Sequence, residues 1–129
     1  MKHIRNILVL FIALMAITPA VFADGWQKQD FKVKGDWTIE QRDDGNYVVL
    51  SDDFKTKKAP DLKLFVSKKA YGDINGKNAT EDAAIISLLS SHKGGQSYKI
   101  PATIDLSDYQ SLIIHCEKYS KLWASTPLK

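Results

Sequence analysis

The segment Leu112-Ile113-Ile114-His115-Cys116 is the strongest buried-strand pattern in the chain. It is a short apolar run of the kind that forms a strand inside a sheet. Side chains alternate between the two faces of a strand, so Leu112, Ile114 and Cys116 share one face. Ile113, His115 and the following Glu117 share the other, which we expect to be the wetter face. Cys116 is therefore predicted to point inward or into a shielded cleft.

Short apolar runs separated by turn residues lie on both sides of this segment. Asp43-Asp44-Gly45-Asn46 has the composition of a hairpin turn. The predicted strands around it and along the chain cover residues 31–34, 37–40, 47–50, 62–69, 97–100 and 119–124. Many short strands with little helix predict an all-β fold, a small antiparallel β-sandwich or barrel of about eight strands.

Residues 80–91 are ambiguous by periodicity. Thr80 followed by Glu81 and Asp82 resembles the start of a helix, and the apolar residues after them suit a helix face. The run 85–89 equally suits a buried strand. The pattern alone leaves both alternatives open.

The N-terminal residues have the order of a secretion signal. Lys2 and Arg5 precede an apolar run over 7–17, which is shorter than the roughly 20 residues needed to span a bilayer. Val21 and Ala23 place small residues at a signal-peptidase site, which predicts cleavage between Ala23 and Asp24. We expect residues 1–23 to be a signal peptide, with no membrane span after cleavage and a secreted or periplasmic product.

The remainder, residues 24–129, suits one domain. Removal of the two basic residues of the signal lowers the formal net charge from +3 to +1, which gives no reason to expect nucleic acid as a partner. A locally basic stretch is interleaved with Asp52, Asp53 and Asp61, which favours a solvated face over a patch for an anionic ligand. Its lysines are Lys55, Lys57, Lys58, Lys63, Lys68 and Lys69.

Cys116 is the only cysteine, so the fold cannot depend on an internal disulfide. A single cysteine also excludes the Cys-x-x-Cys pattern of thioredoxin sites and the Cys-x-x-Cys-His pattern of c-type haem sites. With His92 and His115 it gives one ligand fewer than a structural zinc site normally takes, and we predict no metal site. Cys116 is thus a buried inert thiol, a ligand, a reactive thiol or half of a bridge that links two chains.

Three segments in order, over about residues 31–128, resemble the DM13 domain, the electron transfer domain that accompanies DOMON domains in some animal matrix proteins. The first is Leu50-Ser51-Asp52-Asp53-Phe54 leading to Ala59-Pro60-Asp61-Leu62. The second is Gly95-Gln96-Ser97-Tyr98-Lys99-Ile100-Pro101. The third is Tyr109-Gln110-Ser111-Leu112-Ile113-Ile114-His115-Cys116, followed by Tyr119-Ser120 and Trp123-Ala124.

The resemblance implies a small β domain outside the cytoplasm whose signature cysteine, Cys116 here, serves redox chemistry as a free thiol or as a ligand to haem or another carrier. His115 stands where the family often has Trp or Tyr, and adds a second candidate for cofactor binding. The resemblance also favours a strand over 85–89.

Two functions follow from these patterns. The first is a redox or electron-transfer accessory role centred on Cys116, more an accessory domain than a stand-alone enzyme. It needs a thiolate with a cation nearby, and Lys118 is the nearest cation on the same strand face. Its partner would be a redox protein, and a dimer linked through Cys116 is an option. The alternative is a non-enzymatic binding or structural module outside the cytoplasm, with an inert buried cysteine and loops that recognise a protein or a glycan.

Overall fold

A computed structural model of the chain describes residues 25–129, so the predicted signal peptide and its cleavage site lie outside the described residues. Within this part the backbone forms ten strands. They are β1 (Lys28–Gln29), β2 (Val33–Lys34), β3 (Trp37–Arg42), β4 (Gly45–Leu50), β5 (Lys55–Thr56), β6 (Leu62–Ser67), β7 (Ala83–Leu88), β8 (Gln96–Lys99), β9 (Ser111–Cys116) and β10 (Lys121–Pro127). The helical content is two short 3-10 turns, Tyr71–Asp73 and Leu106–Asp108.

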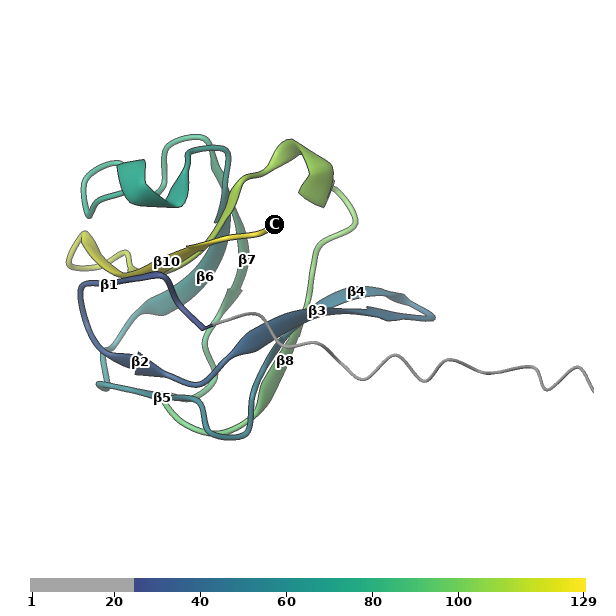
Figure 1. Cartoon of the computed structure of the whole chain (residues 1–129), viewed down its shortest axis with the longest axis horizontal. Coiled ribbons are helices and arrows are strands. Elements are labelled where there is room, and N and C mark those ends of the chain that lie inside the picture. The colour runs from purple at the N-terminus through teal and green to yellow at the C-terminus, as the bar shows by residue number, and fades with distance from the viewer. Residues whose placement is uncertain (1–24) are drawn as a thin grey trace, which may run out of the picture.

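The strands form three antiparallel sheets. The largest has the order β1-β10-β9-β6-β7, and the others are β3-β4-β8 and the pair β2-β5. In Figure 1 the β3-β4 hairpin projects to the right of the five-stranded sheet, and the β2-β5 pair lies at the lower left. This small sandwich-like arrangement confirms the predicted all-β class. In residues 25–129 there is no helix with the length and apolar character needed to cross a membrane.

The predicted central strand, β9, is hydrogen-bonded along both edges. β6 pairs with it from Leu62↔Cys116 to Ser67↔Ser111 without a break in register. β10 pairs with its other edge, with a register shift at Leu122. All six residues of β9 are buried, which agrees with the apolar run that predicts this strand.

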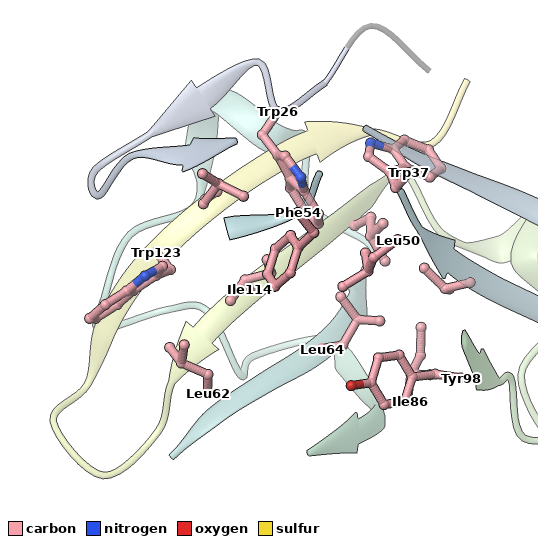
Figure 2. Packing of buried hydrophobic residues seen from close by; sticks show 14 of the residues in the cluster. Trp26, Trp37, Leu50, Phe54, Leu62, Leu64, Ile86, Tyr98, Ile114 and Trp123 are labelled. Atoms are coloured by element: carbon pink, nitrogen blue, oxygen red, sulfur yellow. The ribbon is translucent and has the colours of Figure 1, made fainter. Parts of the chain in front are cut away.

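The main core fills the space between the five-stranded sheet and the two smaller sheets. Leu64 of β6 and Ile114 of β9 point into it from one side, as Figure 2 shows, and Leu50 and Phe54 meet them from the other. Trp123 is also in this core, where its ring stacks on Phe31 with centroids 3.9 Å apart. Alternation along the strands directs these side chains to one face, so burying them against the smaller sheets removes their apolar surface from water.

The opposite face of the five-stranded sheet is also covered, so the face predicted to be the wetter one reaches solvent at Glu117 but not at Ile113 or His115. Ile113 is 0% exposed and His115 is 2% exposed. The segment between β6 and β7 folds back over this face, and its Ile74 and Ala79 pack in a second cluster with Ile113. Sequence alternation indicates which residues share a face, but it cannot show that a distant loop covers that face.

Residues 80–91 form strand rather than helix. β7 occupies Ala83–Leu88 and pairs with β6, which confirms the choice favoured by the family resemblance. Strands β1 and β5, of two residues each, were not predicted. Each is formed by pairing with a strand distant in sequence, and so short a strand carries no periodic pattern of its own.

Gly35 allows the chain to turn from β2 into β3, and replacing it should destabilise the fold. Its φ is +97°, and a Cβ there would lie 2.7 Å from Ser51 Oγ and 3.0 Å from the Cα of Phe54. We expect Gly35→Ala to lower the free energy of unfolding by about 1–3 kcal/mol, measured by urea denaturation. Gly72→Ala is the matched control, because nothing lies within 4 Å of its added Cβ. A change of less than about 0.5 kcal/mol is expected for it. Equal stability of the two variants would contradict the strain assigned to Gly35.

Candidate functional site

Cys116 is the last residue of β9, and its side chain is sealed inside the protein. It is the free cysteine of the described part and is 0% exposed. It belongs to the main core together with Leu62, its partner in register on β6. The prediction that Cys116 points inward is confirmed. A thiol in these surroundings packs as a small apolar group.

Lys118, the cation expected to support a thiolate at Cys116, is on the surface and not beside the buried thiol. Lys118 is exposed on the turn after β9, with its Nζ 5.7 Å from the ring centroid of Tyr119. Its backbone N–H donates to Asp61 Oδ2 at 2.9 Å, which ties this turn to the start of β6. Reactive cysteines occur in electropositive, partly exposed surroundings. The burial of Cys116 among apolar side chains is the opposite of that environment.

His115 points away from Cys116, toward the second cluster on the other face of the sheet. Its ring meets Phe65 edge-on, with centroids 6.3 Å apart. Its Nδ1 is buried and has no hydrogen-bond partner within the described residues. The two residues proposed from sequence to bind a cofactor are therefore adjacent in the chain but separated by the sheet.

Burial lowers the pKa of His115, because it penalises the charged imidazolium. Glu117, the backbone of Lys121 and Asp61 act in the opposite direction, but they do not overcome the desolvation. Both carboxylates are also within 4 Å of Lys63 Nζ, with Glu117 at 2.6 Å and Asp61 at 3.4 Å. Burial therefore favours the neutral imidazole of His115 over the imidazolium.

The family resemblance implies a haem or another carrier at Cys116 and His115, and the residues present do not fit a haem there. Haem iron takes an axial ligand such as His, Cys, Met or Tyr. Cys116 and His115 are fully packed on opposite sides of β9, so a macrocycle could reach either one only by displacing core side chains. In the described part of the chain no three His, Cys, Asp or Glu side chains are grouped to hold a metal ion.

Two clefts border the main core, and Cys116 lines neither. A narrow one of about 140 Å³ lies where residues 58–62 meet 88–92, and the side of His92 contributes to it. A wider one of about 570 Å³ lies over the β2-β5 pair. Its lining residues are Phe31, Lys32, Lys34, Lys55, Thr56 and Lys57. The basic stretch predicted from the sequence includes Lys55 and Lys57 but not Lys32 and Lys34, because their grouping depends on the pairing of β2 with β5, which is distant in the chain.

The fold and its core define a small antiparallel β domain with one buried thiol. The chain belongs to the electron transfer DM13 family, whose model matches residues 25–128. This confirms the family resemblance. Comparison with curated proteins and with solved structures gives no match.

The lowered pKa of His115 predicts a pH dependence of stability. Because the folded pKa lies below the unfolded value of about 6.5, the unfolded chain binds more protons between these two values. Stability should therefore be fully present above about pH 6.5 and fall as the pH drops through this window.

We expect His115→Leu to remove this contribution. The measurement is urea denaturation of both proteins at several values between pH 7.5 and pH 5, and the readout is the difference between their unfolding free energies. Taking this difference cancels the contribution of the carboxylates, which titrate in both proteins. A difference that stays constant over this range would contradict the lowered pKa.

Proposed function

We propose that the protein is a small electron-transfer accessory domain that works outside the cytoplasm, with Cys116 as its redox atom. Membership of the electron transfer DM13 family over residues 25–128 is the observation that carries the proposal. The order of charge, apolar run and small residues in 1–23 supports export to a secreted or periplasmic location. Cys116 is the one thiol of the whole sequence, which makes it the candidate centre.

Burial restricts how Cys116 takes part in redox chemistry. In thiol–disulfide exchange, its thiolate would attack one sulfur of a partner disulfide, form a mixed disulfide and release the other sulfur as a thiolate. That requires direct contact with Sγ, and the same holds for a disulfide between two copies of this chain. The turn 117–120, which follows Cys116 directly, is exposed, so opening at this end of β9 would bring the thiol to solvent.

A specific observation favours a second function. A side chain that is 0% exposed within an apolar core stabilises a fold without any chemistry of its own. In this alternative the protein is a non-enzymatic binding or structural module outside the cytoplasm. Its surface recognises a partner, and Cys116 only fills space. The native-state geometry of Cys116 favours this second function, whereas family membership favours the first.

Thiol reactivity and redox titration together separate the two functions. We expect an aromatic disulfide reagent to label Cys116 at least about a hundredfold more slowly in the native protein than in urea, because labelling waits for local opening. In the electron-transfer function, the native protein gives a redox midpoint that Cys116→Ser abolishes while circular dichroism shows the fold intact. If Cys116 neither reacts with the reagent nor gives a redox midpoint until the protein is denatured, the electron-transfer function is excluded and the structural module remains.

The Cys116 variants should also differ in stability. Cys116→Ala removes a buried sulfur and should cost about 1–2 kcal/mol. Cys116→Ser places a hydroxyl in the same apolar site and should cost roughly 1–3 kcal/mol, unless it finds a hydrogen-bond partner.

Visible spectra of the purified protein, with and without added haem, accompany these measurements. A new absorption band that depends on Cys116 would contradict the conclusion that a haem does not fit.

A further inference from the structure

The cleft over the β2-β5 pair combines a positively charged wall with an aromatic side chain. Val33 and Thr56 point into the core and are buried, so the residues that alternate with them on each strand face outward. Those outward residues are all lysines, namely Lys32, Lys34, Lys55 and Lys57. Figure 1 shows β2 and β5 side by side at the edge of the molecule. The lining residues of the cleft include no acid.

Lys55 stands opposite a second lysine on each of its two sides. Lys34 is the register partner of Lys55, and Lys55 also forms a bridge with Lys93 of the loop after β7. Like charges at directly opposed positions repel each other and destabilise a sheet. We call Lys34, Lys55 and Lys93 the lysine row. We therefore expect the lysine row to lower the free energy of unfolding of the protein without a ligand.

The acids near these lysines in the sequence form no ion pair with them. Asp53 accepts a hydrogen bond from Ser51, and Asp61 pairs with Lys63 at 3.4 Å. Among residues 25–129, no ion pair within 4 Å involves Lys32, Lys34, Lys55 or Lys57. Within this part of the chain these four lysines are exposed and unpaired, so they suit either the solvated face predicted from the sequence or a patch for an anionic ligand. The positive charge is free to attract an anion.

The backbone that carries the lysines is firmly held. Thr56 Oγ1 donates to the carbonyl of Lys32 and accepts from Trp123 Nε1, both at 2.8 Å. Thr56 N–H donates to the carbonyl of His92 at 2.9 Å, which joins β5 to the loop that carries Lys93. Because these bonds fix the strands, the lysine row cannot relieve its repulsion by moving the strands apart. A locally unfavourable arrangement on a rigid support is typical of a functional site.

The cleft also has a ring surface and the size for a molecule larger than a simple anion. Phe31 is half-buried, is braced from behind by Trp123, and lines the cleft. The volume of about 570 Å³ is within the range of roughly 300–1,000 Å³ that small-molecule sites occupy. Charges spread along two strands suit several anionic groups in a series, and the Phe31 ring suits the apolar face of a sugar ring.

We propose that this cleft binds an acidic oligosaccharide, whose carboxylate or sulfate groups contact the lysines while a sugar ring packs on Phe31. Cys116 is not part of the cleft, so the proposal is independent of the redox role. Binding here would relieve the repulsion in the lysine row, which gives the site a signature that a purely structural surface lacks.

The test compares two double variants of equal net charge. Lys34→Gln/Lys55→Gln removes two cleft lysines, and Lys77→Gln/Lys118→Gln removes two exposed lysines outside the cleft. The probe is a galacturonic acid trisaccharide, with a sulfated disaccharide as the second arm, followed by isothermal titration calorimetry at low salt. We expect the cleft variant to lose at least about fivefold in affinity for the acidic sugar that binds, and the control variant to lose less than twofold. Binding should weaken as salt rises.

The same cleft variant should melt at an equal or higher temperature than the unchanged protein, because it removes like-charge repulsion. Weaker binding without lost stability separates a binding role from a structural one. Cys116→Ala should bind the sugar normally, which distinguishes this proposal from the redox function. The proposal is overturned if neither acidic sugar binds, if both double variants lose affinity equally, or if maltotriose, inorganic phosphate or a single-stranded oligonucleotide binds as tightly.

Discussion

The structure depends on one constraint, that β9 is enclosed on every side. β6 and β10 satisfy its backbone hydrogen bonds along both edges, and apolar clusters cover both of its faces. Unpaired backbone groups in such a place would cost several kcal/mol, so pairing and packing have to form together. The polar side chains of β9 need hydrogen-bond partners for the same reason. Ser111 Oγ donates to the carbonyl of Lys69 at 2.6 Å, whereas His115 is left with one unpaired nitrogen.

Enclosure of β9 also determines what Cys116 can do. The electron transfer DM13 family provides the reason to look for redox chemistry, and the fold keeps the only thiol away from solvent. Because Cys116 is 0% exposed, any reaction at this sulfur requires local opening of the fold. The same feature would protect a structural cysteine from oxidation in an oxidising compartment, because oxidation follows thiolate character and exposure.

Unlike Cys116, the lysines around the β2-β5 pair are exposed to solvent. The β2-β5 pair and the residues that flank it present four lysines outward, while Thr56 and Trp123 anchor the pair from within. A buried hydrogen-bond network of this kind resists distortion, so it can maintain an arrangement of charges that repel one another. Inside and outside thus have different roles. The interior supplies rigidity and holds the thiol, and the surface supplies the charge and the aromatic ring on which the proposed recognition rests.

The sequence by itself determined the fold class, the central strand and the family, because apolar runs and turn residues are local signals. The apolar run at 112–116 fixed Cys116 as inward-facing, and periodicity alone left 80–91 undecided. Only the tertiary structure decided that His115 is buried, because the covering segment with Ile74 and Ala79 comes from a distant part of the chain. Only the tertiary structure placed Lys34, Lys55 and Lys93 in one row, because that depends on pairing between β2, β5 and the 92–94 loop. Such long-range contacts are set by the packing of the whole chain, which no local pattern records.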